Sequence, residues 1–240
     1  MPTETFHKLN PDKKQKIIRC AIENFAHNGY TGTSMDSVAE CAKVAKGALY
    51  RYFTSKKDLY MLVVDNLVDD IDRYAQEFIE SHSTNNAFET FRDHMVSIHE
   101  LYKRFSVHQQ VLCNILYQEE LEFKGEVLAK FGKLTTQYTR LVLQRGIARG
   151  EIREDIDLDA AGFVIESVTD RFHDGTTMPY LDHGFGLYQQ PQEVINRKAD
   201  QIIESFRRAF GKLNPDTGDF VSTVNKSGIS RISSNMDRSY

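Results

Sequence analysis

The chain has 240 residues, of which 40% are hydrophobic and 27% are charged, a composition typical of globular proteins. It contains no apolar run near the ~20 residues that a membrane-spanning helix needs. Its polar N-terminus also lacks the apolar stretch of a secretion signal. We therefore expect a cytoplasmic protein without a membrane partner.

The net charge of −4 is unevenly distributed along the chain. Residues 1–60 hold ten Lys and Arg against six Asp and Glu, whereas the rest of the chain holds 20 against 28. A basic N-terminal region in an otherwise acidic chain indicates that this region binds a polyanion. The alternative is chance, because windows of this length commonly drift by a few charges.

The first predicted helix begins at Asn10, a good N-cap, with Pro11 at the first helical position. Apolar residues then recur on one face as far as Phe25. Asn28-Gly29 ends this helix, because glycine readily takes the left-handed conformation that closes a helix.

Two short helices and a long one follow. The second begins near Thr33, where Thr33 and Asp36 have the outline of a capping box, and it ends near Lys43. The third covers roughly residues 45–53. Ser55 is the predicted cap of the fourth, which is long.

Helices are also predicted in the second half, over about 86–103, 106–119, 121–149, 158–173 and 191–211. The last of them carries an apolar stripe formed by Val194, Ile195, Ile202, Ile203, Phe206 and Phe210. The Gly and Pro content of 172–191 predicts a long loop, and the polar composition of 212–240 predicts a mostly disordered tail. Because no alternating apolar run is long enough for a sheet, the predicted fold class is all-α.

The sequence has three cysteines, Cys20, Cys41 and Cys113. An odd count without a C-x-x-C pattern argues against a disulfide framework and against a zinc site. We expect each cysteine to be a free, small, buried hydrophobe, with redox sensing as the alternative.

The stretch AKVAKGALYRYF, residues 42–53, concentrates basic and aromatic side chains. Two short helices joined by a tight turn form a helix-turn-helix, whose second helix can lie in the major groove of DNA. Val38, Ala42 and Leu49 supply the small or apolar inner side. The outer side should carry donors for phosphates and base edges, here Lys46, Tyr50, Arg51 and Tyr52, with Gly47 and Ala48 allowing a close approach.

Residues 11–60 resemble the DNA-binding domain of the TetR family of bacterial repressors. The family pattern of Phe-x-x-x-Gly-Tyr, Thr-Ser, Gly-x-Leu-Tyr-x-x-Phe and Ser-Lys-x-x-Leu is matched by FAHNGYTGTSMDSVAECAKVAKGALYRYFTSKKDL. Residues 145–162 resemble, more weakly, the family's junction into its dimerising helices. The chain departs from the pattern at Lys43, where glycine is common, and at Ala45, where Ser or Thr often caps the recognition helix. We therefore expect a positive φ at Lys43 and no side-chain cap at Ala45.

The resemblance implies a helix-turn-helix DNA-binding domain over 11–71 with its motif at 34–53, a ligand-binding and dimerisation domain over 72–211, and the tail over 212–240. It places phosphate contacts on Thr33, Ser34, Tyr50 and Lys56. It places base-reading positions on Lys46, Gly47, Ala48 and Tyr52, with Arg51 as a further candidate. The alternative for each is a solvated surface residue.

In the family, the C-terminal helices bind a small molecule and form the dimer. The predicted ligand-binding residues are Phe91, His94, Met95, Tyr102, Phe105, Leu112, Phe131 and Arg171, because apolar walls with a few polar groups suit a lipophilic ligand. The alternative for each is an ordinary position in a helix-bundle core. The helices over 158–173 and 191–211 are predicted to form a four-helix bundle with a second copy, which would cover the apolar stripe.

Catalytic motifs are absent from the sequence, which has no G-x-S-x-G, P-loop, H-E-x-x-H or G-x-G-x-x-G. His173, Asp174 and His183 are irregularly spaced and make a weak case for a metal site. We therefore predict a homodimeric transcriptional repressor, not an enzyme, that uses no cofactor or metal, binds double-stranded operator DNA and is released by a small lipophilic ligand. The alternative is a ligand-blind DNA-architecture or replication-associated protein on the same fold, which a body without a cavity would favour.

Overall fold

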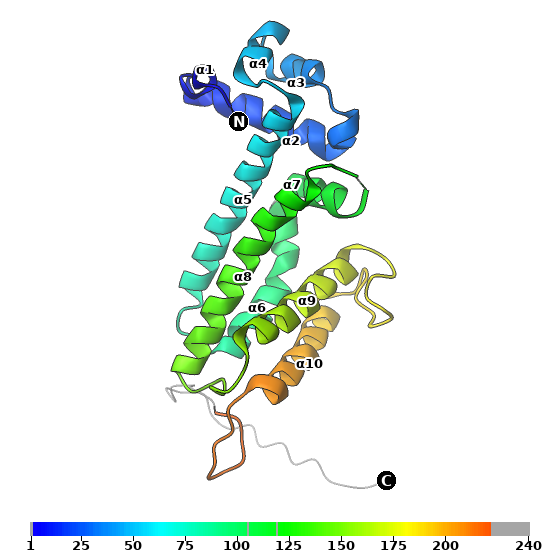
Figure 1. The fold of residues 1–240 in the computed structure, drawn as a ribbon. Coiled ribbons are helices and arrows are strands. Elements are labelled where there is room, and N and C mark those ends of the chain that lie inside the picture. Colours follow the sequence, from blue (N-terminus) through cyan, green and yellow to red (C-terminus); the bar gives the residue numbers. More distant parts are fainter. Residues whose placement is uncertain (1, 105, 119, 222–240) are drawn as a thin grey trace.

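The structure is a computed structural model that describes residues 2–104, 106–118 and 120–221; of residues 98–104, 106, 108–109 and 117–118 it describes the backbone alone. Within this part of the chain the regular elements are all helices, accompanied by two isolated β-bridges, so the predicted all-α class is confirmed. Figure 1 shows short helices clustered at one end and a longer bundle at the other, joined by α5 (Lys56–Ser81). We call residues 2–60 the head and residues 61–221 the body.

The helices of the head before α5 are α1 (Glu4–His7), α2 (Pro11–Gly32), α3 (Met35–Ala42) and α4 (Lys46–Tyr52). Asn10 caps α2 by accepting a hydrogen bond from the backbone of Asp12, which confirms the predicted start. At Gly29 the backbone leaves helical geometry with a φ of 67°, a conformation that glycine adopts without a steric penalty. The kink therefore lies where the sequence predicted the end of this helix.

The predicted capping box at Thr33 and Asp36 is wrong by one residue. Ser34 is the N-cap of α3, and it exchanges hydrogen bonds with Ser37. Thr33 is buried, and its hydroxyl instead donates to the Asn24 carbonyl at 2.9 Å. The pattern identified a cap, but it could not show that the kink in α2 turns Thr33 inward.

Both departures from the family pattern have the expected local geometry. Lys43 follows α3 in the left-handed conformation, with φ 54° and ψ 46°. Ala45 precedes α4 in an extended conformation and provides no side-chain hydrogen bond to it. The first turn of α4 therefore has no capping side chain, and an N-cap hydroxyl is ordinarily worth about 1 kcal/mol.

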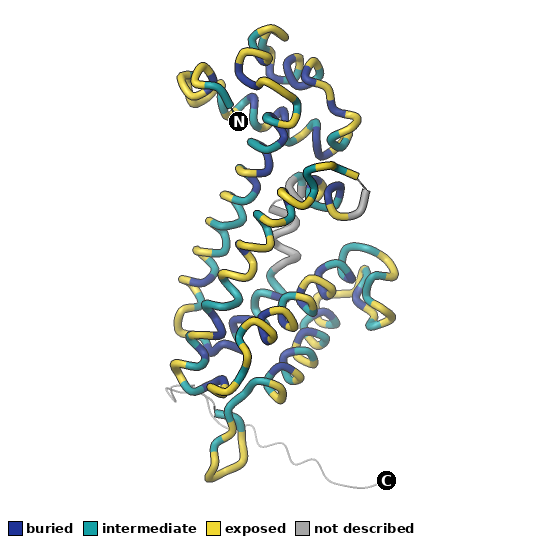
Figure 2. Tube along the Cα trace, viewed as in Figure 1, coloured by how far each residue is buried: buried dark blue, intermediate teal, exposed yellow. Residues whose placement is uncertain are grey.

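The short helix α1 was not predicted, and it packs against the end of α4. Phe6 is 3% exposed, and its ring centroid lies 4.9 Å from that of Phe53. The backbone N–H of Thr3 donates to the Tyr52 carbonyl at 2.9 Å, and its hydroxyl donates to the Arg51 carbonyl at 2.8 Å. The N-terminal arm therefore satisfies the last carbonyls of α4 and helps to close the interior of the head, which Figure 2 shows in dark blue.

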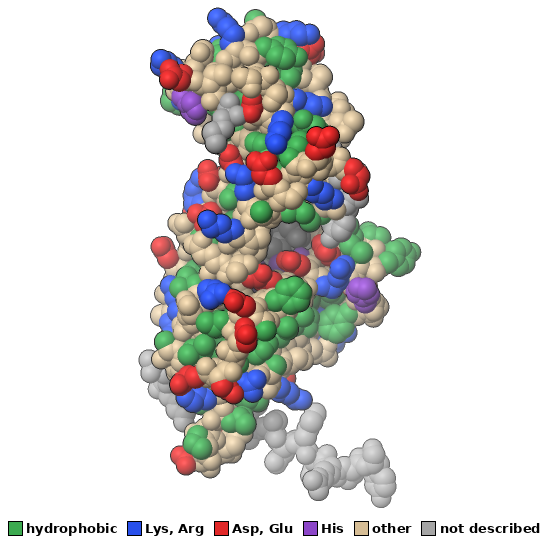
Figure 3. Space-filling view, viewed as in Figure 1, with side chains coloured by type: hydrophobic (Ala, Val, Ile, Leu, Met, Phe, Trp, Pro, Cys, Tyr) green, Lys and Arg blue, Asp and Glu red, His purple; other side chains and the backbone are tan. Residues whose placement is uncertain are grey.

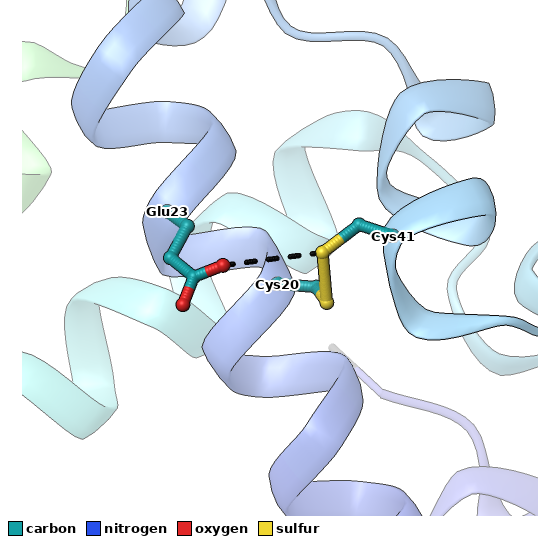
Figure 4. Close-up of side chains that lie close together, drawn as sticks. All are labelled: Cys20, Glu23 and Cys41. Atoms are coloured by element: carbon teal, nitrogen blue, oxygen red, sulfur yellow. Dashed lines mark hydrogen bonds between the residues drawn. A yellow bond between two sulfur atoms is a disulfide. The ribbon is translucent and has the colours of Figure 1, made fainter.

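Cys20 and Cys41 are joined in a disulfide, so the prediction of free cysteines is wrong for this pair. Cys20 lies on α2 and Cys41 on α3, with their Cα atoms 5.7 Å apart, and Figure 4 shows the bond beside Glu23. A carboxylate oxygen of Glu23 lies 4.0 Å from the Cys41 sulfur. Sequence spacing could not reveal the pair, because the two residues meet only where the two helices cross. Cys113 is free, and burial raises the pKa of its thiol.

The body adds α6 (Ala87–Arg104), α7 (Ser106–Cys113), a π-helix η1 (Asn114–Gln118), α8 (Lys124–Ala148), α9 (Leu158–Thr177) and α10 (Gln192–Phe210). These ranges match the helices predicted for the second half to within a few residues. Glu151 is 1% exposed and accepts a hydrogen bond from the Ala87 N–H at 2.7 Å, so the turn after α8 caps the start of α6. None of the described helices is both long and apolar enough to cross a membrane.

Half of the apolar stripe on α10 is buried within the single chain, whereas the prediction had a second copy cover the whole stripe; Val194, Ile202 and Phe210 are half-buried. Ile195, Ile203 and Phe206 are each at most 7% exposed and belong to the core of the body. The main neighbour of α10 is α6. Larger apolar exposure occurs on α9, at Phe163 (72% exposed) and Val164 (43% exposed).

The tail predicted over 212–240 begins with ordered residues. The backbone N–H of Lys212 donates to the Glu151 carbonyl at 2.9 Å, and Leu213 bridges to Phe220. The Phe220 ring lies so close to Gly211 that a Cβ there would come within 2.8 Å of it. The structure therefore differs from the prediction over 212–221, while residues 222–240 lie outside the described residues.

Candidate DNA interface and ligand cavity

The helices α3 and α4 form the predicted helix-turn-helix. Val38, Ala42 and Leu49 are buried where the two helices meet, and at most 2% of each is exposed. The turn over residues 43–45 reverses the chain between them. This packing holds α4 at the surface of the head, with one side facing outward.

The outer side of this motif carries most of the predicted DNA-binding residues. Ser34, Lys46, Gly47, Tyr50 and Arg51 are exposed, and Ala48 and Lys56 are half-buried. A Cβ built at Gly47 would meet nothing within 4 Å, so a DNA backbone can approach the helix closely there. Lys46 pairs with Asp36 on the surface, and this hydrogen bond raises the pKa of Lys46.

Two of the predicted DNA-binding side chains are buried instead. Thr33 is 2% exposed, and its hydroxyl is bound within the head. Tyr52 is 4% exposed, and its ring centroid lies 6.2 Å from that of Phe6. Their side chains are therefore structural in this conformation, and Tyr52 is turned inward because α1 packs over it.

Lys56 has an internal role that the sequence did not indicate. Its ammonium group donates to the Tyr30 carbonyl at 2.7 Å and to the Thr33 carbonyl at 3.0 Å. It also lies 4.4 Å from the centroid of the Tyr30 ring. Lys56 thus ties the start of α5 to the carbonyls that follow the kink in α2, in addition to placing a positive charge near the motif.

The body contains a cavity of about 120 Å³ between α5, α6, α8 and α9. Its walls are mainly apolar and include the aromatic rings of Tyr74, Phe78, Phe91 and Tyr138. Its polar residues include His94, Thr169, Glu166 and Asp170. Asp170 and Thr135 are exposed and mark its mouth; Figure 3 shows acidic and hydrophobic side chains side by side over α8 and α9.

Of the predicted ligand-binding residues, Phe91 and His94 lie on this wall. Met95 is fully buried in the core, and Arg171 borders a separate hollow between α9, α10 and the loop that joins them. Leu112 and Phe131 do not line the cavity; Phe105 and the side chain of Tyr102 lie outside the described residues. Glu166 and Asp170 also line the cavity but were not predicted, although their spacing of four residues indicates one acidic helix face.

Burial changes the protonation of the groups around the cavity. It lowers the pKa of His94 to about 4. The pKa of His173, whose ring centroid lies 5.6 Å from that of His94, is lowered well below its ordinary value by burial and by His94. Burial, and then the carboxylates of Asp174 and Glu166, raise the pKa of Asp170 to about 6. Near neutral pH the cavity therefore holds neutral imidazoles and acidic side chains.

Comparison with known proteins supports the assignment of the head. The model of the family described as "Bacterial regulatory proteins, tetR family" matches residues 17–61, which contain the helix-turn-helix. Residues 17–61 thus match the DNA-binding domain of the TetR family. The chain is 28% identical over 205 residues to a "Probable acrEF/envCD operon repressor" of Escherichia coli strain K12, covering 80% of this chain and 86% of that protein.

Solved structures of TetR regulators share the fold. A TetR family transcriptional regulator from Chloroflexus aurantiacus superposes with a TM-score of 0.57 at 25% identity, covering 88% of this chain and 98% of the other. FadR from Bacillus subtilis, in complex with stearoyl-CoA, superposes with a TM-score of 0.60 at 20% identity, covering 80% and 96%. Together with the match of residues 17–61 and the related repressor, this makes the chain a DNA-binding transcriptional regulator.

Several contacts join the body to the head, including the packing of α7 against α2 and the Phe123 ring, whose centroid lies 5.2 Å from that of Tyr30. The helix α5 runs from the motif into the cavity wall. In addition, Asn114 of η1 is 4% exposed, and its amide donates to the carbonyls of Phe25 and Ala26 on α2, at 3.2 Å and 2.9 Å. The contact between Asn114 and α2 was not predicted, because α2 and η1 are far apart in the sequence.

Proposed function

We propose that this regulator is a homodimeric repressor and that a small lipophilic ligand in the body cavity releases it from its operator. The observation that carries the proposal is the shared helix α5. Lys56 at its start is bound within the head, and Tyr74 farther along forms part of the cavity wall. A ligand that requires another tilt of α5 would therefore also move the head.

The contact between Asn114 and α2 supports the same coupling. It joins η1 of the body to the carbonyls just before the kink at Gly29. Because α2 packs against α3 of the helix-turn-helix, a change in the body that moves α2 or α5 can alter the position of α4. A ligand shifts this equilibrium only by its differential affinity for the two positions.

The dimer is proposed from the exposed apolar face of α9. Phe163 and Val164 are exposed in the single chain, and a two-fold contact between copies would cover them. Two copies would then present two α4 helices to two half-sites, as helix-turn-helix dimers do. Residues 11–71 would form the DNA-binding domain and residues 72–211 the ligand-binding and dimerisation domain.

The relatives are consistent with this function. One of them is named a probable operon repressor, and FadR of Bacillus subtilis forms a complex with stearoyl-CoA. The cavity of the present chain is smaller than the ~300–1,000 Å³ of typical ligand pockets. A ligand would therefore extend through the mouth beside Asp170 or enlarge the cavity on entry.

The test begins by selecting an operator from random duplexes with the purified chain. Lipophilic compounds are then screened by thermal shift, and operator affinity is measured with each compound that stabilises the protein. We expect a ligand to weaken operator binding by roughly 5- to 150-fold. Compounds that stabilise the protein and leave operator affinity unchanged would contradict the proposed release.

A further inference from the structure

We propose that the body cavity selects lipophilic cations, in particular aromatic amines and quaternary ammonium compounds, over anions and neutral molecules. The inference rests on the proposed function, because it names the chemical class of ligand for the same cavity. It also separates this chain from FadR of Bacillus subtilis, whose complex contains stearoyl-CoA, a ligand with an anionic head group.

The charge of the cavity wall is the first support. Glu166 and Asp170 both line the cavity, and the described lining residues include no Lys or Arg. The two carboxylates are one turn apart on α9, so they lie on the same side of the helix. His94 adds no positive charge near neutral pH, because burial lowers its pKa to about 4. A bound molecule therefore meets a negative potential.

One carboxylate oxygen of Glu166 adds a second support. Its Oε2 accepts a hydrogen bond from the Thr136 hydroxyl at 3.3 Å. Its Oε1 is buried, and no described residue donates a hydrogen bond to it. A buried acceptor without a donor is costly, and a ligand ammonium group can remove that cost.

Two arginines that directly follow lining residues in the sequence, Arg171 and Arg140, are engaged outside the cavity. Arg171 lies 3.8 Å from a carboxylate oxygen of Asp174 and donates to the Leu181 carbonyl at 3.5 Å. Arg140 of α8 pairs with Asp159 at the start of α9. Because neither arginine lines the cavity, the carboxylates of Glu166 and Asp170 are not neutralised by a cation on its described wall.

The aromatic part of the wall suits the same class of ligand. Tyr74, Phe78 and Tyr138 line the cavity, and aromatic faces attract cations. The Tyr138 hydroxyl donates to the Asp72 carboxylate at 2.6 Å, which fixes the position of its ring. The volume of about 120 Å³ accommodates a compact aromatic or trimethylammonium group, and a longer substituent can leave through the mouth.

The experiment uses the full chain and three small probes of similar size: benzyltrimethylammonium, phenylacetate and benzyl alcohol. Titration calorimetry gives the affinity, and thermal shift gives an independent readout. We expect the cation to bind about 10- to 100-fold more tightly than the anion, a ratio typical of a hydrogen-bonded or paired charge. Glu166→Gln and Asp170→Asn should each remove most of this preference.

Glu77→Gln is the matched control, because Glu77 is exposed on α5 and does not line the cavity. Its preference for the cation should equal that of the parent. Circular dichroism establishes that each near-isosteric variant is folded, so a loss of preference reports on charge. A similar loss in the Glu77 variant would assign the preference to the overall charge of the body and overturn the inference.

The failure of this inference can be distinguished from the failure of the proposed function. Equal or tighter binding of phenylacetate or benzyl alcohol, or an undiminished preference in both cavity variants, overturns the selection for cations. Absence of binding by the cation overturns it as well. In each case an anionic or neutral compound from the operator-release screen would still establish the proposed function.

Discussion

The head and the body are both helical, but their interiors differ in kind. The head is filled by side chains such as Leu49 and Phe53, neither of which is exposed, and a disulfide joins two of its helices. The body buries His173, half-buries His94 and leaves a cavity beside Glu166. Burying polar groups is unfavourable, so their presence indicates a binding role in the body, whereas the head is built to hold one shape.

The largest expected effect tests the rigid interior of the head. Phe53→Ala would remove a ring that is completely buried, which ordinarily costs about 3–5 kcal/mol. We expect urea unfolding to show this loss and DNA binding to disappear. Phe163→Ala is the matched control: its ring is 72% exposed on α9, and its effect on monomer stability should stay within about 0.5 kcal/mol. Similar losses in both variants would contradict the packing described here.

The next effect tests the disulfide that distinguishes the head. Cys41→Ser should lower the free energy of unfolding by about 3 kcal/mol, because the bond closes a loop with a sequence separation of 21 residues. Cys113→Ser is the control, since Cys113 is free. Thiol labelling of the unfolded parent without reductant should modify Cys113 alone. Labelling of Cys20 and Cys41 as well would show that the bond does not form.

A third prediction concerns the contact between the two regions. Asn114→Ala would leave the Phe25 and Ala26 carbonyls without their side-chain donor, at a cost of about 1–3 kcal/mol. It should also reduce the effect of any releasing ligand on operator affinity, as measured by operator titration with and without the ligand. Asn66→Ala is the control, because Asn66 donates only to Leu62 within α5. Unchanged coupling in the Asn114 variant would assign the coupling to the other contacts between body and head, α5 among them.

A fourth prediction tests the outer face of the head. Lys46→Ala should weaken binding to DNA and alter the sequence preference, because the resemblance places Lys46 at a base-reading position. Lys130→Ala in the body removes a lysine that pairs with Asp65 and should leave both affinity and preference unchanged. Equal affinity and equal preference in the parent and the Lys46 variant would show that this side chain does not contact DNA.

Local features of the head could be predicted from the sequence. The cap at Asn10 and the break at Gly29 follow from preferences of single residues, and the left-handed Lys43 follows from the glycine that is common at this position of the family pattern. The burial of Tyr52 could not, because it depends on α1, a helix of four residues that carries no periodic signal. The pairing of Cys20 with Cys41 could not be predicted either, because it depends on how two helices cross.

In the body the order and length of the helices could be predicted, but the cavity could not. Apolar periodicity marked the stripe on α10 without showing whether α6 or a second copy covers it. Phe91 and His94 were found because both are aromatic residues on one amphipathic helix. Glu166 and Asp170 were missed, because acidic residues on a helix usually face water, and only the packing of α8 against α9 brings them to the cavity.

The smallest expected effect is a pH dependence of the free energy of unfolding, which comes from titratable groups inside the body. In the folded chain the pKa of Asp170 is raised to about 6, so the folded state holds this proton more tightly than the unfolded state does. The stabilising effect of Asp170 is therefore complete below its ordinary pKa of 3.8 and is lost as the pH rises through about 6. His94 acts in the opposite direction: burial lowers its pKa from 6.5 to about 4, so it costs stability as the pH falls between these values.

Because these two effects oppose each other, the informative quantity is the difference in unfolding free energy between the parent and Asp170→Asn. We expect the unfolding free energy of the parent minus that of the variant to decrease from pH 4 to pH 6. The variant thus becomes more stable relative to the parent, and the difference becomes constant above about pH 7. Affinity for benzyltrimethylammonium should change in the opposite sense, increasing as the Asp170 carboxyl group ionises, and the variant should lose this pH dependence. A difference that stays constant between pH 4 and pH 7 would mean that Asp170 titrates as a solvated surface carboxylate. The acidity of the cavity would then come from Glu166 alone.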